Sequence, residues 1–323
     1  MSEQPEPTEP AHPQPATPLP PPKKRAMGEL GRRLLTAAVL VPAVVGVIVL
    51  GGLPYLFTVI LFILLAQREF YGLIEDKGAQ PHVALGLGAS VVVALLVYRG
   101  SEYDAMLLMT VLLLVLMVAQ LRKQVIADAL SSISGTFFGV FYVGWLLSHA
   151  ILLRRFDSVM TSRYGADSVS GMGLVPDAGI FLVIFTLTIV VWCDAGAYFA
   201  GGAYGRHPLA PRISPSKTLE GALGGLLGGV AAALIVKAIF DIFWPTLSAA
   251  LPWRWVVPFA LILSIVGIIG DLVESLLKRD AEVKDAGRLL PGMGGVLDRI
   301  DAPLLALPVM YYMLLAYFYL TFR

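Results

Sequence analysis

The stretch that decides the fold runs from residue 252 to residue 277 and reads PWRWVVPFALILSIVGIIGDLVESLL. Between Trp255 and Gly270 it contains no charged residue. At a rise of about 1.5 Å per residue, a helix of this length crosses the roughly 30 Å hydrocarbon core of a bilayer. Its last turns then carry Asp271 and Glu274. The stretch therefore predicts a membrane-spanning helix that ends in charged side chains.

The rest of the chain repeats this apolar pattern. Hydrophobic residues make up 57% of the 323 residues and charged residues only 15%, a balance that a soluble core does not need. The alternating pattern of a membrane β-barrel is absent. We therefore predict an all-α, polytopic bundle of about nine transmembrane helices, within a range of eight to ten. The apolar runs cover residues 34–51, 54–67, 83–98, 105–121, 133–153, 178–203, 219–243, 252–277 and 302–321.

The N-terminal residues differ in composition from this bundle. Residues 1–25 are a Pro-rich polar tract that ends in Lys23, Lys24 and Arg25, which predicts a disordered cytoplasmic tail. A single integral membrane domain then covers residues 26–323. The one cysteine, Cys193, excludes an internal disulfide framework and every multi-cysteine metal site.

The basic residues predict the orientation in the membrane. With a cytoplasmic N-terminus and nine helices, most of the 24 Lys and Arg residues fall on the cytoplasmic side, as the positive-inside rule requires. The two richest polar loops, residues 204–218 and 278–301, then both face the cytoplasm. Nucleotides and metal ions are available there.

Polar side chains gather where the opening stretch ends. Asp271, Glu274, Ser275 and Lys278 follow the spacing i, i+3, i+4, i+7, so they project from one face of a helix. An unpaired charge at the centre of a membrane costs about 2.5–3.5 kcal/mol on insertion scales, and the cost falls near a helix end. A charged cap of the helix therefore explains Glu274 as well as a site does.

The segment PGMGGVLDRID, residues 291–301, adds a glycine turn and two carboxylates. Glycine lets the backbone approach a phosphate, and carboxylates such as Asp298 and Asp301 suit a hard cation such as magnesium. Asp301 also precedes Ala302 and Pro303, a position where acidic capping of the last helix is equally expected.

A second polar segment, DAGAYFAGGAYGRHPLAPRISPSKTLEG, covers residues 194–221. It begins with Asp194 at the membrane border. Its glycines either allow close helix packing or contribute to a site. Arg206, Arg212 and Lys217, separated by prolines, form a basic loop that could bind phosphates or anionic headgroups.

Both segments resemble those of the phosphatidate cytidylyltransferase (CDP-diacylglycerol synthase) family. Residues 275–301 carry the pattern S-x-L-K-R-x4-K-D-x-G-x2-L-P-x-M-G-G-V-x-D-R-I-D, and residues 194–221 also keep that family's order. One position departs from the family pattern, because Met293 stands where the family usually has His. A thioether neither donates a hydrogen bond nor titrates near neutral pH as imidazole does. We expect that the family's His tunes the reaction; the alternative is that this chain has lost or altered its activity.

The resemblance implies transfer of a cytidylyl group from CTP to phosphatidic acid, which gives CDP-diacylglycerol and pyrophosphate in phospholipid biosynthesis. It also implies a multi-pass protein of the bacterial cytoplasmic membrane whose active site faces the cytoplasm, with no nucleic-acid partner and with homodimerisation left open. The implied cofactor is Mg²⁺, accompanied in a two-cation centre by a monovalent cation, and the implied metal ligands are Asp271, Ser275 and Asp298. The catalytic residues implied are Asp271, Lys278, Asp298 and Asp301. The substrate-binding residues implied are Asp194, Arg212, Lys217, Ser275, Arg279, Lys284, Asp285, Gly294, Gly295 and Arg299.

Two other classes of function remain open from the sequence. A transporter also carries acids at membrane depth, and Lys237 with Asp241 could serve one. The polar residues, however, crowd at one membrane face, and no internal repeat is evident. Another CTP-using lipid enzyme, such as a polyprenol kinase, would transfer phosphate instead of a nucleotidyl group.

Overall fold

The structure is a computed structural model that describes residues 27–123, 128–171, 173–287, 289 and 294–321. Seven of its helices are long and apolar enough to cross a membrane, and Ala38–Leu50 and Val83–Tyr98 are shorter apolar helices. Together these nine helices of the described residues confirm the predicted all-α membrane bundle. The predicted disordered tail over residues 1–25 and the position of Met293 lie outside the described residues. The elements are α1 (Met27–Leu50), α2 (Gly52–Asp76), α3 (Val83–Tyr98), α4 (Glu102–Gln120), α5 (Ala129–Gly139), η1 (Val140–Trp145), α6 (Leu146–Arg154), α7 (Phe156–Tyr164), α8 (Ala166–Gly171), α9 (Gly179–Tyr204), β1 (Pro208–Ala210), β2 (Ser214–Thr218), α10 (Leu219–Phe243), α11 (Pro245–Ser248), α12 (Trp253–Asp280) and α13 (Leu297–Thr321).

Two helix boundaries differ from the apolar runs in a way that matters for the site. Helix α2 continues to Asp76, and α13 begins at Leu297 instead of residue 302. Charged residues interrupt the apolar runs at both places, but they do not interrupt the helical backbone. As a result Glu69 lies within α2, and Asp298 and Asp301 lie in the first turns of α13.

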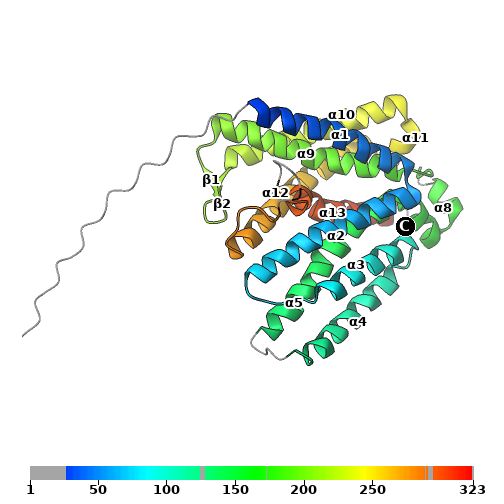
Figure 1. Cartoon of the computed structure of the whole chain (residues 1–323). Coiled ribbons are helices and arrows are strands. Elements are labelled where there is room, and N and C mark those ends of the chain that lie inside the picture. Colours follow the sequence, from blue (N-terminus) through cyan, green and yellow to red (C-terminus); the bar gives the residue numbers. More distant parts are fainter. Residues whose placement is uncertain (1–26, 124–127, 172, 288, 290–293, 322–323) are drawn as a thin grey trace, which may run out of the picture.

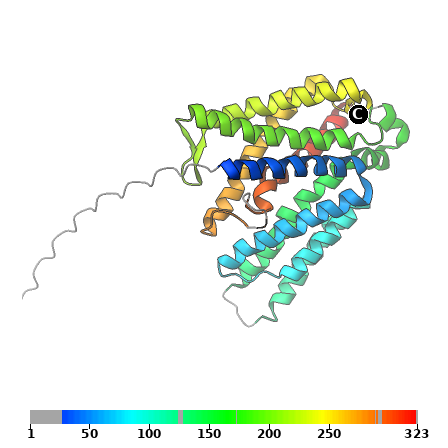
Figure 2. The ribbon, with the colours of Figure 1, turned by 45° about the horizontal axis from the view of Figure 1, so that its top comes forward.

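The helices form two groups with α12 and α13 between them (Figures 1 and 2). Helices α1, α9 and α10 make one group, and α2–α5, η1 and α6 make the other. Helix α13 packs against α12, α6, α9 and α2, and α12 packs against α9 and α10. The acids of α12 and α13 therefore lie where the two groups of helices meet.

Glycines bring α9 and α10 together. A Cβ placed on Gly196 would lie 2.5 Å from the carbonyl oxygen of Gly224, and one on Gly228 would lie 2.7 Å from that of Trp192. Gly221, Gly225 and Gly229 repeat at four-residue spacing along α10, the small-residue pattern that lets membrane helices approach closely. Helix packing thus explains several glycines of this pair.

The basic loop between α9 and α10 is an antiparallel β-hairpin, which the sequence had not predicted. Pro208 of β1 pairs with Thr218 of β2, and Ala210 pairs with Ser214. The first turn of α10 anchors the hairpin, because the Glu220 carboxylate accepts the backbone N–H groups of Arg206 at 3.0 Å and His207 at 3.2 Å. The prolines do not prevent this pairing, since a two-stranded ribbon consists only of edge strands.

Candidate active site

The last turns of α12 carry the polar face that the helical spacing predicted. Ser275 Oγ donates to Asp271 Oδ1 at 3.4 Å, and Lys278 Nζ lies 2.6 Å from Glu274 Oε2. Four residues separate the partners of each pair, as helical geometry requires. The Glu274 side chain is only 1% exposed and that of Lys278 14%, so this ion pair is shielded from water.

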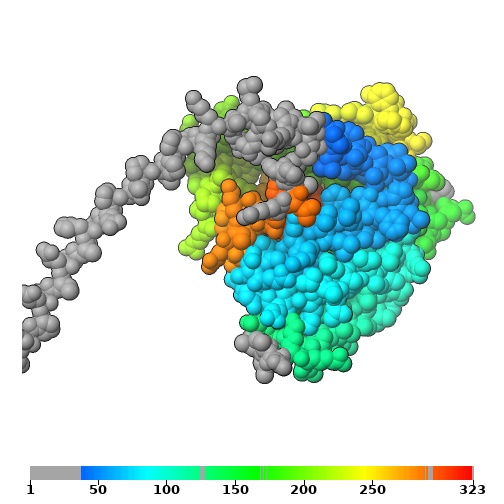
Figure 3. Space-filling view, viewed as in Figure 1, coloured from blue at the N-terminus to red at the C-terminus, as the bar shows by residue number. Residues whose placement is uncertain are grey.

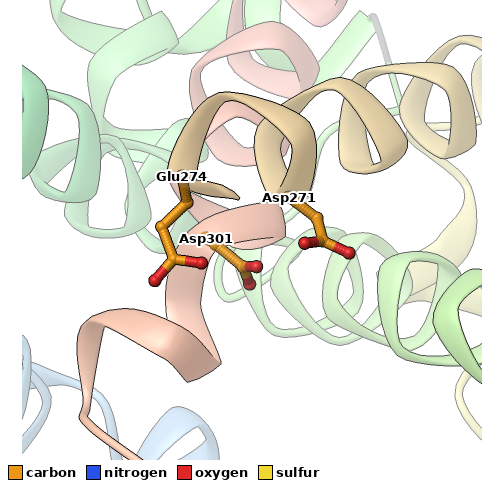
Figure 4. Close-up of side chains that lie close together, drawn as sticks. All are labelled: Asp271, Glu274 and Asp301. Carbon is orange, nitrogen blue, oxygen red and sulfur yellow. The ribbon is translucent and has the colours of Figure 1, made fainter. Parts of the chain in front are cut away.

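Helix α13 brings a third carboxylate to this face (Figure 4). Asp271, Glu274 and Asp301 each place one carboxylate oxygen within 4.8 Å of those of the other two. The close approach depends on Gly270, because a Cβ there would lie 2.6 Å from the Asp301 carbonyl oxygen. Glu274 Oε1 is buried and has no hydrogen-bond partner among the described residues. Three acids held together with an unsatisfied buried oxygen are a donor set that suits a hard cation.

Asp298 lies beside this acid cluster and is held from several sides. Its Oδ1 is 2.7 Å from Lys278 Nζ, so Lys278 bridges Glu274 and Asp298. Its Oδ2 accepts the N–H of Gly295 at 2.8 Å and that of Ala286 at 3.1 Å. These bonds hold the backbone at Ala286 and at Gly295 against the carboxylate.

Gly294 is required by the same fold. Its φ is +84°, which strains any other residue. A Cβ there would also lie 2.9 Å from Asp298 Oδ2.

The hairpin reaches this site from the other polar loop. Lys217 Nζ, on β2, lies 2.5 Å from Asp271 Oδ2. Arg279 Nε donates to the Ile213 carbonyl oxygen at 3.3 Å. In the space-filling view the end of α12 and the segment after it, in orange, reach the surface between the hairpin and α2 (Figure 3). The two polar loops thus form one site.

Asp194 and Arg299 complete the charged surroundings. Asp194, about three turns before the end of α9, interacts electrostatically with Asp271, Lys217 and Arg299. The predicted binding residues Arg212, Lys284 and Asp285 lie farther out, on exposed parts of the hairpin and of the segment after α12. The structure thus gathers most of the predicted residues around the acid cluster and leaves these three at its solvent-facing edge.

The geometry also places two acids in the site that the sequence did not assign to it. From the sequence, a helix cap explained Glu274 as well as a site role did, but Glu274 lies in the acid cluster. Glu69 of α2 was not singled out, yet its Oε2 accepts the N–H of Leu297 at 2.8 Å. The available signal was an acid directly after an apolar run, next to Arg68 in the same helix, since a charged residue near the membrane calls for a partner.

Comparison with known proteins assigns the chain to a family. A model of the cytidylyltransferase family matches residues 31–317. The chain belongs to the cytidylyltransferase family. It is therefore a nucleotidyltransferase, and its apolar helices make it an integral membrane protein.

Several relatives in this family carry the same name. The phosphatidate cytidylyltransferase of Synechocystis sp. is 30% identical over 299 residues, which cover 87% of this chain and 95% of that protein. That of Bacillus subtilis is 43% identical over 132 residues, or 41% of this chain and 46% of the relative. That of Brucella suis is 46% identical over 134 residues, with the same two shares. These two alignments cover less than half of either relative, whereas the first spans nearly the whole protein.

Proposed function

We propose that the chain transfers the cytidylyl group of CTP to phosphatidic acid and forms CDP-diacylglycerol and pyrophosphate. The observation that carries the proposal is the juxtaposition of Asp271, Glu274 and Asp301 with Lys217 and Lys278 at one end of a membrane bundle. Acids and ammonium groups so placed suit a nucleoside triphosphate with its metal ion. The membrane supplies the second substrate.

The acid cluster fits Mg²⁺ through Asp271, Glu274 and Asp301. Asp298 and Ser275, which the sequence predicted as metal ligands, lie beside this cluster and stay predicted ligands. A second, monovalent cation also stays a prediction. When bound, Mg²⁺ neutralises the triphosphate and the leaving pyrophosphate.

The basic side chains around the acids would bind the phosphates of CTP. Lys278 has three N–H donors and uses two of them on Glu274 and Asp298, which leaves one for a phosphate oxygen. Lys217 reaches the site from the hairpin, and Arg279 lies at its outer edge. In this arrangement the residues orient the α-phosphate and stabilise charge, which is the main work of phosphoryl transfer.

An apolar cavity of about 490 Å³ adjoins the site and suits the lipid substrate. It is lined by α1, α2, α6, α9 and α13, and Arg299 and Ile300 form its boundary next to the acid cluster. The acyl chains of phosphatidic acid would occupy this cavity, with the phosphate toward Arg299. A phosphate monoester has a second pKa of about 6 and is largely a dianion at neutral pH. Its oxygen can therefore attack the α-phosphorus without a dedicated base, while the bond to the bridging oxygen of pyrophosphate breaks.

The cytoplasmic face is the side on which we place this site. The support is the excess of Lys and Arg at that end of the bundle, including Lys77, Lys123 and Lys217. We place the chain in a bacterial cytoplasmic membrane because relatives such as those of Synechocystis sp. and Bacillus subtilis are bacterial. A homodimer stays a prediction that crosslinking in membranes can test.

The decisive experiment follows the α-phosphate of CTP. Purified protein is incubated with CTP labelled at the α-phosphate, phosphatidic acid and Mg²⁺, and label is expected in the lipid fraction. A parallel reaction with γ-labelled CTP should leave the lipid unlabelled, whereas a lipid kinase would label it. Absence of label from the lipid in the first reaction, beside an active known synthase, would refute the proposal.

A further inference from the structure

Glu69 is a buried carboxylate that lies far along the chain from the acids of the proposed site. It is only 9% exposed and lies between Arg68 and Phe70 of α2. Burying an ionisable group is costly unless bonds to it compensate. A buried Glu69 carboxylate therefore needs contacts that compensate the cost of its burial.

The Glu69 carboxylate contacts the backbone that leads into α13. Its Oε2 accepts the N–H of Leu297, the first residue of that helix, at 2.8 Å. A Cβ placed on Gly295 would lie 2.5 Å from the same oxygen, and one on Gly287 would collide with Oε1. The backbone at both glycines thus packs directly against the carboxylate.

Glu69 and Asp298 both contact the backbone at the start of α13. Asp298 accepts the N–H groups of Ala286 and Gly295. Ala286 precedes Gly287, and both Gly287 and Gly295 pack against Glu69. The N–H groups in the first turn of a helix lack partners within the helix. The Glu69 carboxylate of α2 accepts one of these N–H groups in α13, that of Leu297.

We propose that Glu69 is a positioning residue: it anchors Gly287, Gly295 and Leu297 to α2 and thereby places Asp298 and Asp301 against Glu274 and Lys278. The kinetic part of this inference rests on the proposed function. The contact with Leu297 requires an acceptor oxygen at the end of a side chain as long as that of Glu69. Gln retains that oxygen, whereas Asp is shorter by one methylene and Ala has no oxygen.

The test compares Glu69→Gln, Glu69→Asp and Glu69→Ala, with Glu75→Ala as the matched control. Glu75 lies on the same helix but forms an exposed pair with Arg68. Misplacement of reacting groups by about 1 Å can cost about 100-fold in rate. We expect kcat to fall about 100-fold in the Asp and Ala variants and by less than tenfold in the Gln variant, with KM for phosphatidic acid unchanged and the control at the wild-type rate.

Hydrogen exchange provides a readout that needs no substrate. Glu69→Ala should speed exchange in peptides covering residues 286–300 and leave α9 and α10 protected as in the wild type. Gly287→Ala should produce the same local change, because its Cβ would displace the carboxylate without altering Glu69.

Three results would overturn the inference: wild-type kcat in Glu69→Ala, an equal loss of protection along the whole chain, or no local change in Gly287→Ala. Local loosening in a protein that labels no lipid would instead refute the proposed function and leave the anchor standing.

Discussion

Lys278 offers the sharpest test of how the site is stabilised. Its ammonium lies 2.6 Å from Glu274 and 2.7 Å from Asp298, whose side chains are 1% and 9% exposed. Substitution Lys278→Met retains the apolar stem and removes the charge, which leaves two shielded carboxylates without their shared cation. Removal of one partner from a buried pair costs about 3–5 kcal/mol. We expect a loss of unfolding free energy of this size.

The matched control is Lys77→Met. Lys77 also pairs with an acid at this end of the bundle, Asp280 at 2.9 Å, but their side chains are 47% and 66% exposed. Such surface pairs contribute about 0–1 kcal/mol. Thermal and denaturant unfolding in detergent should therefore separate the two variants clearly. An equal loss of stability in both would refute the argument that burial makes the Lys278 bridge strong.

Turnover by the Lys278 variant provides a second measurement. A hydrogen bond to a charged group contributes about 1.5–3 kcal/mol. Loss of one phosphate contact should thus lower kcat/KM for CTP by roughly 10- to 150-fold in Lys278→Met. Lys77→Met should stay near the wild-type rate. A Lys278 variant with wild-type kcat/KM would exclude the phosphate contact.

Three further predictions concern metal binding, helix packing and the one departure from the family pattern. Asp271→Asn should remove most turnover and raise the Mg²⁺ concentration for half-maximal rate, while circular dichroism shows an intact helical fold; an unchanged Mg²⁺ dependence would contradict the ligand assignment. Gly196→Ala should cost about 1–3 kcal/mol of stability, because its Cβ would meet the Gly224 carbonyl oxygen. Gly202→Ala, with nothing within 4 Å of its Cβ, should be neutral, and equal melting temperatures for the two would refute the packing argument. Met293→His should change the rate less than tenfold and add a dependence on pH near the usual histidine pKa of about 6.5, measured as rate against pH; recovery of activity from an inactive parent would show instead that the chain had lost its function.

The membrane bundle was predictable because its signal is local. Each span is a run of apolar residues long enough to cross a bilayer, and the nine runs correspond to nine helices of the described residues. The ends were less predictable, since a charged residue ends an apolar run without ending a helix. That is why α13 was expected at residue 302 but begins at Leu297. The hairpin over residues 208–218 was missed because its prolines led us to interpret the segment as a basic loop without strands.

The sequence by itself determined the nine apolar helices and the polar face of Asp271, Glu274, Ser275 and Lys278, because helical spacing relates residues only a few positions apart. The tertiary structure alone decided which groups from distant segments join that face. It added Asp301 to the acid cluster and brought Lys217 to Asp271.

It also placed Glu69 at the start of α13, across a separation of 228 residues. The physical reason is that periodicity and hydropathy describe each helix separately. Contacts between helices depend on how closely their surfaces pack, and here glycines such as Gly270 set that approach.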